Sequence, residues 1–568
     1  MSASKSFLSD PRYGYDVVVA VTQDSINATM KQFLNKLEEP VVTVCIVADE
    51  NARPALMDFA TLLEETGGID PFTIPAGADP QTTPEIERLQ HARFMAGFRA
   101  RLGLPPGVPP YKLPHLVELG SDTSAVTFNM LCSEFDVVQF IPAGGYSPAT
   151  WLHLAQPAGA PWIIRSKVDL RLLEVDDSAY HTLPEDVKAR IKNLDADAFS
   201  VQQLLFDLTN ARLAAGRPDI AGIEPGSDLE LILDRYFLGV YFDQLQKDGQ
   251  PVLGTAITHR ADAQLPSSFA LTDLNFHVNP VAGDDGRPLP QPTLEQQGLA
   301  TLNYLCAINH RALPPAVAFS WNWVDPQEKS DFHGVAVTNK AAFVDRLRLA
   351  LDDHARHNCV QPSVRVTLEN FYTTVKYRLE VSSYQEPVVV APTTGSVVLQ
   401  YDYKSERAYD EAGVSAIGGS LEMKSSYHMD VALAGSTITI TQHLLVYLSA
   451  NNGAISGDGN VVDRTMTDTY TLGITDQGEL TATTASQSTD NSQNPDTGWL
   501  DFLGAFLHDV LDRLDEAVRN FVSPSFHPVP MNAMQDYVFP GGKTFAFKAV
   551  GFSDNQDLVA HITYADPV

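Results

Sequence analysis

Two histidines and a cysteine lie close together in the run HARHNC, at residues 354–359. His354 and His357 are three residues apart, which puts two imidazoles on one face of a helix, where they could share a metal ion with Cys359 nearby. A helical pattern ends at this point, and positively charged histidines at a helix C-terminus are stabilised by the helix dipole. We favour this structural interpretation over a metal site and predict no cofactor.

The other motifs that could bind a metal, a sugar or a substrate are also weak evidence for a functional site. The run SGDGN, at residues 456–460, lacks the spaced ligands of a calcium loop and predicts a hairpin turn. Trp321 and Trp323 share one face of an extended segment, where they could bind a sugar or a lipid headgroup but more simply anchor a core. The sequence has no GxSxG, HExxH, P-loop or GxGxxG signature. It therefore favours a protein that is not an enzyme, although dispersed residues could still form a catalytic site.

The segment Tyr15–Leu37 changes its hydrophobic period in the middle. Its first residues, VVVAV, alternate as in a strand, and Thr22 or Asp24 can then cap a helix. The apolar residues that follow recur at helical spacing and are Ile26, Met30, Phe33, Leu34 and Leu37. The pattern predicts a strand that runs directly into a helix over Ser25–Leu37.

The same pattern returns at His333–Asp353. A short strand is followed by a polar turn at Thr338–Asn339, and then by Phe343, Leu347 and Leu351 on one helix face. This similarity predicts a second strand–helix unit, although a chance recurrence remains an alternative.

The rest of the chain divides into a mixed part and a strand-rich part. Further helices are predicted for Ala55–Leu63, Ile86–Leu102, Ala198–Leu213, Asp228–Gln246 and Trp499–Phe521. Strands are predicted for residues 41–47, for most of 116–175, and for Phe269–Val278 and Gly298–Asn309, which a polar loop at Val281–Gln296 separates. Residues 363–500 are predicted to be nearly all strands, because apolar and polar residues alternate there between Gly, Asn and Asp turns. We predict an N-terminal half over residues 1–325 and a C-terminal half over 326–568, which could form one continuous elongated body.

Two terminal stretches resemble a known superfamily. The run DVVVAVTQDSINATMKQFLNKL, at residues 16–37, is similar to the opening of the tubular lipid-binding (TULIP) domains. FPGGKTFAFKAVGFSDNQDLVAHITYADP, at residues 539–567, resembles the OrfX-type branch encoded in clostridial toxin gene clusters. The resemblance implies an α+β fold, in which long, strongly curved antiparallel sheets wrap around long amphipathic helices. It also implies a lipid or another hydrophobic ligand, with other proteins of the same gene cluster as possible partners.

The charge of the chain narrows the set of partners. The 70 acidic residues outnumber the 39 basic ones, which gives a formal net charge of −31. Such a field repels phosphate backbones, so we expect no nucleic-acid binding. No run of apolar residues is long enough for a transmembrane segment.

The cysteines and the N-terminal sequence predict the compartment. Cys45, Cys132, Cys306 and Cys359 are far apart, which predicts buried free thiols. The first residues lack the apolar core of a signal peptide. We therefore expect a cytoplasmic protein, with non-classical release as an open route.

Three functions remain open at this point. The first is a non-enzymatic TULIP-like protein that binds a lipid or another hydrophobic molecule between helix and sheet. The others are a toxin-complex component that acts through protein contacts without lipid, and an enzyme with a dispersed site. For the first, the candidate ligand-lining residues are Ile26, Met30, Phe33, Leu37, Phe237, Tyr241, Phe506 and Val510.

Overall fold

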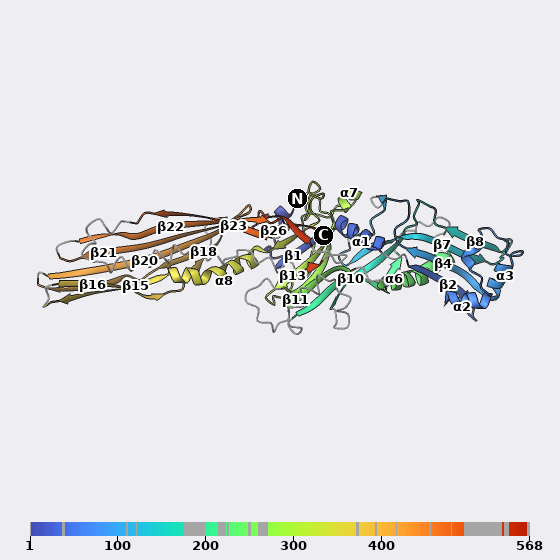
Figure 1. Cartoon of the computed structure of the whole chain (residues 1–568), viewed down its shortest axis with the longest axis horizontal. Coiled ribbons are helices and arrows are strands. Elements are labelled where there is room, and N and C mark those ends of the chain that lie inside the picture. Colours follow the sequence, from blue (N-terminus) through green and yellow to red (C-terminus); the bar gives the residue numbers. More distant parts are fainter. Residues whose placement is uncertain are drawn as a thin grey trace.

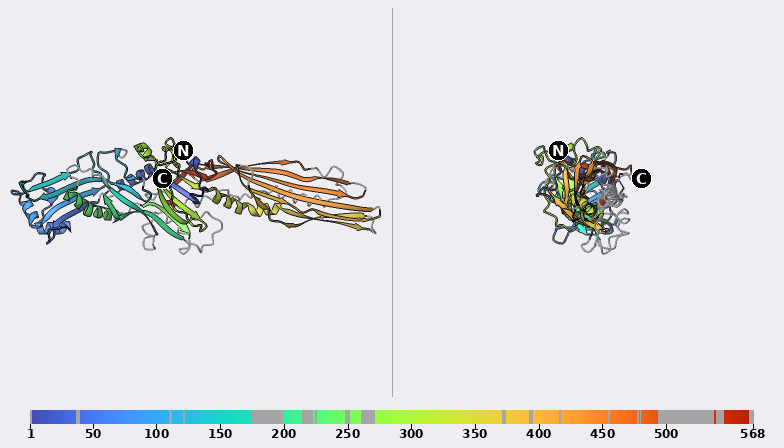
Figure 2. Two further views of the ribbon diagram at one scale, coloured as in Figure 1. Left: turned by 180° about the vertical axis from the view of Figure 1, so that it is seen from behind. Right: turned by 90° about the vertical axis from the view of Figure 1, so that its left-hand side faces the viewer.

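The chain forms an elongated body in which the first and last strands meet near the middle (Figures 1 and 2). The computed structural model describes residues 2–36, 40–109, 112–120, 122–174, 199–213, 223, 226–247, 252–259, 271–370, 374–391, 395–415, 417–453, 456–476, 478, 480–492, 537–538 and 545–564. Leu37 and the helix predicted for Trp499–Phe521 lie outside these residues.

A six-stranded sheet occupies the middle of the body. Its order is β12 (Leu271–Asn279), β13 (Thr301–Ile308), β1 (Val17–Thr22), β14 (Gly334–Thr338), β26 (Leu558–Tyr564) and β25 (Phe545–Phe552). The register pairs Val19 with Tyr304 on one side and with Ala336 on the other. All residues of β1 are buried, as expected for a β-branched run covered on both faces. The two predicted strand–helix units therefore begin on adjacent antiparallel strands.

Two sheets and several helices extend from the middle of the body to the end that carries α2 and α3 (Figure 1). One sheet has the order β3 (Pro54–Met57), β2 (Val41–Ala48), β4 (Phe94–Leu102), β7 (Cys132–Ile141) and β8 (Thr150–Ala155). The other has the order β24 (Tyr537–Val538), β11 (Val252–His259), β10 (Phe199–Leu213), β9 (Ile164–Glu174), β6 (Ala125–Met130) and β5 (Val117–Glu118).

The opposite end is built from long strands and one long helix. Its larger sheet has the order β17 (Val388–Val390), β18 (Val397–Lys404), β20 (Ile417–Ala434), β21 (Thr437–Asn451), β22 (Ser456–Ile474) and β23 (Leu480–Asp490), and β19 (Ala408–Val414) pairs with β20. A separate hairpin joins β15 (Val360–Glu369) to β16 (Thr374–Tyr384). Along β21, buried and partly exposed residues alternate, as predicted for strands with one covered face.

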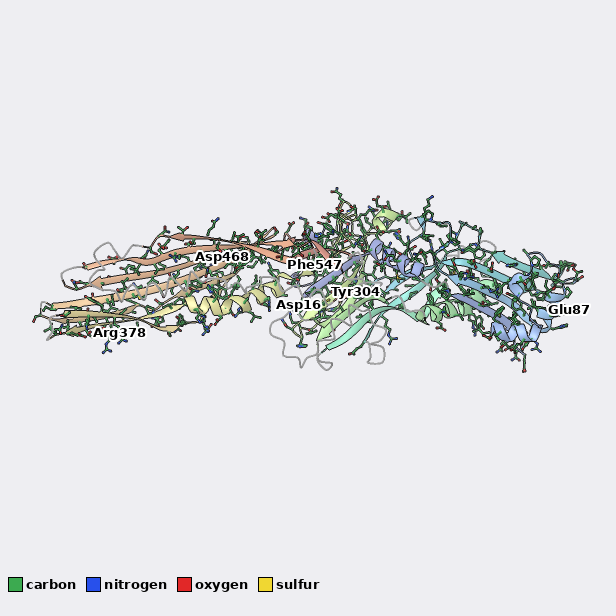
Figure 3. All side chains as sticks on the ribbon, viewed as in Figure 1. Asp16, Glu87, Tyr304, Arg378, Asp468 and Phe547 are labelled. Carbon is green, nitrogen blue, oxygen red and sulfur yellow. The ribbon has the colours of Figure 1, made fainter. Side chains whose placement is uncertain are left out.

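The described residues also form helices. They are α1 (Gln23–Lys36), α2 (Phe59–Thr66), α3 (Pro84–His91), α5 (Asp228–Ile232), the π-helix η5 (Leu233–Phe237), α6 (Leu238–Lys247), α7 (Leu294–Gln297) and α8 (Lys340–Asn358), with short 3-10 turns η1 (Ala3–Lys5) and η2 (Pro71–Thr73). Phe343, Leu347 and Leu351 of α8 are buried on the face that the sequence predicts. Figure 3 places Glu87 of α3 and Arg378 of β16 toward opposite ends of the body.

The α+β class is confirmed, whereas sheets that wrap around long amphipathic helices stay a prediction. The strand pairs described here are antiparallel, and helices accompany them, so the fold is α+β. The predicted helix over Ser25–Leu37 is α1. Strong curvature of the sheets, and the division of the chain near residue 325, stay predictions.

Three of the predicted helices are wrong in whole or in part. Ala198–Leu213 contains strand β10, which pairs with β9 on one side and β11 on the other, so two ladders of backbone hydrogen bonds override the local helical spacing. Ile86–Leu102 begins in α3 but continues as β4 after a turn at Arg93, whose φ is 57°. Ala55–Leu63 begins in β3, and helix α2 starts only after its N-cap, Asp58.

The SGDGN run also differs from its prediction as a turn. Ser456 pairs with Asn451, and Asp458 pairs with Ser449, so these residues form the beginning of β22. The chain reverses just before them, where Gly453 has a φ of 84°. The glycine at the reversal supplies the backbone freedom that the turn requires.

Candidate functional site

Helix α1 presents an apolar face to the core and a polar face to an open pocket. Its N-terminus is fixed by Thr22, whose Oγ1 accepts a hydrogen bond of 3.3 Å from the Ser25 amide. Ile26, Met30 and Leu34 are almost fully buried. These residues pack α1 against the hydrophobic core, so the opposite face of the helix is free to contact solvent or a ligand.

The predicted ligand-lining residues that the structure describes lie in packed regions. Ile26 and Met30 belong to the main hydrophobic core. Phe237 and Tyr241 lie in an aromatic cluster, in which the ring centroids of Phe237 and Phe135 are 4.8 Å apart. Tyr241 also donates a hydrogen bond of 3.2 Å to the carbonyl of Leu131.

The remaining candidates cannot be placed beside these four. Leu37, Phe506 and Val510, and the side chain of Phe33, lie outside the described part of the chain. A ligand-lining role for all eight residues stays a prediction.

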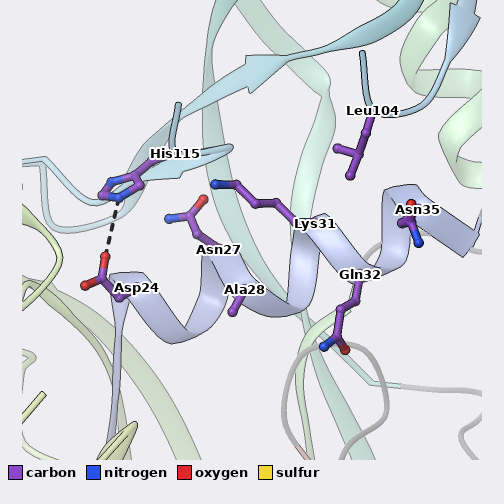
Figure 4. A pocket seen from close by; sticks show the side chains of 8 residues that line it. All are labelled: Asp24, Asn27, Ala28, Lys31, Gln32, Asn35, Leu104 and His115. Carbon is purple, nitrogen blue, oxygen red and sulfur yellow. Dashed lines mark ion pairs between the residues drawn. The ribbon is translucent and has the colours of Figure 1, made fainter. Parts of the chain in front are cut away.

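A pocket of about 460 Å³ lies along the polar face of α1 (Figure 4). Its lining residues are Asp24, Asn27, Ala28, Lys31, Gln32, Asn35, Leu104 and His115. Six of them come from α1, whereas Leu104 and His115 come from the segment between β4 and β5. We call this cavity the α1 pocket. Its volume lies in the range of small-molecule sites.

One end of the α1 pocket is fixed by Gln23, Asp24 and His115. The backbone amide of Leu119 donates to Oε1 of Gln23 at 2.5 Å, which leaves the Gln23 amide nitrogen to donate to Nδ1 of His115 at 2.7 Å. Nδ1 is then an acceptor, and the proton of a neutral ring lies on Nε2. This Nε2 is 3.3 Å from Oδ1 of Asp24 (Figure 4).

Asn27 and Lys31 extend from α1 toward the segment that carries His115 (Figure 4). Asn27 donates to the carbonyl of Val117 at 2.8 Å and accepts from the Val117 amide at 2.9 Å, so it ties the helix to β5. Nζ of Lys31 donates to the carbonyl of Leu113 at 3.2 Å. Burial lowers the pKa of Lys31, whereas the nearby charge of Asp24 acts in the opposite direction.

A smaller pocket of about 110 Å³ shares Asp24 and Ala28 with the α1 pocket. Its other lining residues are Thr22, Ser25, Gly298, Leu299, Lys329 and His333. A Cβ at Gly298 would collide with the carboxylate of Asp24, so a glycine is required where this side chain lies. The hydroxyl of the buried Ser25 has no hydrogen-bond partner among the described residues.

The histidines near the end of α8 lie within hydrogen-bond distance of other protein groups. His354 lies 2.9 Å from Oε1 of Gln442, and His357 lies 2.6 Å from the carbonyl of Asp353. Among the described residues, no group of three or more His, Cys, Asp or Glu is placed to hold a metal ion. The proposed positive charge is wrong for His354, because burial lowers its pKa to about 4.

The tryptophans and cysteines are structural in the positions described. Trp321 and Trp323 are buried, and the Trp323 ring centroid is 4.8 Å from that of Phe319, which confirms the core-anchor interpretation. The four cysteines are free and buried, as predicted. Burial raises the pKa of the Cys132 thiol to about 12, so it is a poor nucleophile at neutral pH.

Sequence reasoning missed the α1 pocket. The polar stripe of α1 was visible, because Asp24, Ala28, Lys31 and Asn35 recur at helical spacing opposite the apolar stripe. Nothing in the sequence indicates that Leu104 and His115 face this stripe.

Comparisons with known proteins find solved structures that are similar to this chain, of which two are described here. The crystal structure of P47 of Clostridium botulinum E1 is similar at a TM-score of 0.42 and 8% sequence identity, covering 97% of this chain and 98% of that one. The crystal structure of a lipopolysaccharide binding protein is similar at a TM-score of 0.30 and 8% identity, covering 97% of this chain and 100% of that one. No family model and no curated protein matches the sequence. No helix in the described ranges is long and apolar enough to span a membrane.

Proposed function

We propose that this chain is a non-enzymatic, TULIP-like binding protein that holds a lipid or another hydrophobic molecule with a polar head at the α1 pocket. The observation that supports the proposal is the pocket itself, which is open and lies on a helix whose other face is anchored in the core. Ala28, Leu104 and the aliphatic stem of Lys31 supply apolar surface, while Asp24, Asn27 and His115 supply polar groups. A ligand with both characters matches this lining.

Native mass spectrometry after exposure to a mixed lipid extract tests the proposal. Ala28 is exposed and lines both pockets, so Ala28→Trp fills the cavity without changing the core. We expect lipid adducts on the wild type and a loss of most of them in Ala28→Trp. Leu349→Trp, at an exposed position of α8, is the matched control and keeps the adducts. A wild type that takes up no lipid would contradict the proposal.

A second proposal is a component of a toxin-gene-cluster assembly that acts through protein contacts. The observation in its favour is the cross-strand pair Arg365–Arg378 in the β15–β16 hairpin, because like charges directly opposite each other in a sheet are destabilising. Both residues are exposed and line a pocket of about 350 Å³, together with Lys376 and with Glu369, whose carboxylate lies 2.7 Å from the Lys376 ammonium. An acidic protein segment has a charge complementary to the two exposed guanidinium groups.

Titration with a polyglutamate peptide tests the second proposal. We expect binding that weakens with added salt and that is lost in Arg365→Gln/Arg378→Gln. Lys404→Gln, at an exposed end of β18, is the control and retains the binding. If the double variant binds the peptide as tightly as the wild type does, the two arginines do not bind an acidic partner and the second proposal is wrong.

A further inference from the structure

The contacts of His115 in the wall of the α1 pocket require one form of its ring. The backbone amide of Leu119 can only donate, so Oε1 of Gln23 accepts from it, and the Gln23 amide nitrogen donates to Nδ1 of His115 at 2.7 Å. Nδ1 must therefore carry a lone pair. The proton of the neutral ring then lies on Nε2, which is 3.3 Å from Oδ1 of Asp24 (Figure 4).

Gln23 cannot reverse its side-chain amide to suit a protonated ring. Its side chain is buried, and turning the amide over would place its NH2 group against the Leu119 amide, so that two donors would face each other. Its backbone is held as well. The Gln23 amide donates to the carbonyl of Ala300 at 2.8 Å, and the Gln23 carbonyl accepts from Nδ2 of Asn27 at 2.9 Å. The surrounding structure therefore fixes the orientation that requires a neutral imidazole.

Charged side chains surround His115 on two elements. On α1, the Asp24 carboxylate is next to Nε2, and Lys31 extends toward the segment that carries His115 (Figure 4). On β5, Glu118 accepts from Nδ2 of Asn129 at 2.7 Å, and the same Nδ2 donates to the His115 carbonyl at 2.6 Å. The carboxylates and the ammonium act on a ring charge in opposite directions. The atom placed against Nδ1 remains the glutamine amide nitrogen, which donates whatever charges lie nearby.

The small pocket brings further titratable groups to the other side of Asp24. Lys329 and His333 line it together with Asp24, and Nζ of Lys329 lies 3.2 Å from the carboxylate of Glu295. Both lie outside the lining of the α1 pocket, to which His115 contributes the imidazole. A change of the α1 pocket in the pH range of histidine titration is therefore assigned to this ring.

We infer that the α1 pocket holds its ligand while His115 is neutral, and that protonation of His115 opens this end of the pocket and releases the ligand. This inference rests on the proposed function. A proton on Nδ1 places the ring N–H against the Gln23 NH2 group, so the contact between them breaks. His115 and Leu104 are the lining residues that do not belong to α1, so a ring that turns away removes part of the facing wall. Asn27 remains bonded to the backbone of Val117, which keeps the change local.

The position of the proton is tested first, without a ligand. Nitrogen NMR of the full chain labelled at histidine distinguishes a ring nitrogen that carries a proton from one that does not, and the signals missing in His115→Gln belong to His115. At neutral pH we expect the proton on Nε2 and the lone pair on Nδ1. A neutral ring protonated on Nδ1 would contradict the contact with Gln23 and overturn the inference, whatever the protein binds.

Lipid uptake is then compared on both sides of the range in which histidines titrate, at about pH 7.5 and about pH 5.5. The protein is exposed to the mixed lipid extract at each pH, and the adducts are measured by native mass spectrometry. We expect the adducts to fall by about fivefold or more at the lower pH, the effect of one lost hydrogen bond in the pocket wall. Equal adducts at the two pH values would overturn the inference and leave the proposed function intact. If no lipid binds at either pH, the proposed function fails and this inference fails with it.

Variants assign the pH effect to the contact between Gln23 and His115. In Gln23→Glu, one carboxylate oxygen can accept from the Leu119 amide and the other from Nδ1–H of a protonated ring, so we expect the adducts to survive at the lower pH. In His115→Gln no group titrates at this position, and the adducts should be the same at both pH values. His91→Gln removes an exposed histidine of α3 and should release lipid as the wild type does.

Thermal melts at both pH values show whether each variant is folded. If Gln23→Glu does not fold, the comparison of His115→Gln with His91→Gln still decides the assignment. Release at the lower pH that persists in His115→Gln would show that other groups control the uptake of lipid, and would overturn the inference.

Discussion

The carboxylate of Asp557, near the C-terminus, accepts a hydrogen bond of 2.7 Å from the backbone amide of Leu8, near the N-terminus. The same carboxylate accepts from the hydroxyl of Ser6 at 2.7 Å and from the amide of Lys340 at 3.0 Å, at the start of α8. Asp557 is fully buried. One side chain therefore joins the first segment, the last hairpin and the second strand–helix unit.

We expect Asp557→Ala to lower the free energy of unfolding by roughly 2–5 kcal/mol, because it leaves several buried donors without an acceptor. Urea denaturation measures this change. Asp554→Ala is the control, because the ion pair of Asp554 with Lys5 joins two exposed side chains and is worth about 1 kcal/mol or less. Similar losses in the two variants would contradict the joining role of Asp557.

The close approach of β1 and β14 gives a second prediction. A Cβ at Gly334 would collide with the backbone carbonyl of Ala20, across the strand pair that joins the two strand–helix units. We expect Gly334→Ala to lower the free energy of unfolding by roughly 1–3 kcal/mol, as other overpacking substitutions do. Gly120→Ala, where no atom lies within contact distance of the new methyl group, should change stability little. Thermal melts that show no difference between the two variants would disprove the prediction.

The sequence predicts an element correctly where its local hydrophobic pattern agrees with the way the element packs in the folded protein. The change from strand to helix after Val21 and again after Val337 was visible, and both helices bury those residues of the predicted apolar faces that the structure describes. The prediction of a helix failed at residues 198–213. Apolar residues match helical spacing there, but the backbone of β10 pairs with strands on both sides. Pairing with distant strands is not encoded in local spacing, so this segment could not be assigned from the sequence alone.

The α1 pocket could likewise be predicted only in part from the sequence. Its helical half could be read as a polar stripe containing Asp24 and Lys31. Its other half depends on the hydrogen bonds that hold Gln23 to Leu119 and Asn27 to Val117, which connect α1 with residues far along the chain. Those contacts follow from the packing of the whole chain and have no local signature.

The histidine at the end of α8 gives a prediction for pH dependence. Burial lowers the folded-state pKa of His354 to about 4, whereas an ordinary histidine titrates near 6.5. As the pH falls, the unfolded chain takes up this proton before the folded chain does. The stability that neutral His354 contributes is therefore fully present above about pH 6.5 and is lost between there and about pH 4, on the order of 3 kcal/mol.

Urea denaturation across this pH range checks the slope. His354→Gln removes the titrating group, and we expect stability to fall less steeply with acid than in the wild type. Leu349→Ala changes an exposed, non-titrating residue of the same helix and should keep the wild-type slope. An identical slope in His354→Gln and the wild type would show that other groups control the acid sensitivity.

The last prediction concerns Phe237, which the sequence assigns to a ligand site and the structure places in an aromatic cluster. Its ring centroid is 4.8 Å from that of Phe135 and 5.8 Å from that of Phe98, and the side chain is fully buried. We expect Phe237→Ala to lower the free energy of unfolding by roughly 3–5 kcal/mol, because it leaves a cavity in a close-packed region. Phe237→Leu should cost less, since it fills more of the space, and Leu231→Ala, at an exposed position of α5, should cost little. Lipid uptake by the Leu variant, measured by native mass spectrometry, should match that of the wild type, because Phe237 is not part of the α1 pocket lining. Unchanged stability together with altered lipid uptake would instead place Phe237 beside a ligand, in agreement with the prediction made from the sequence.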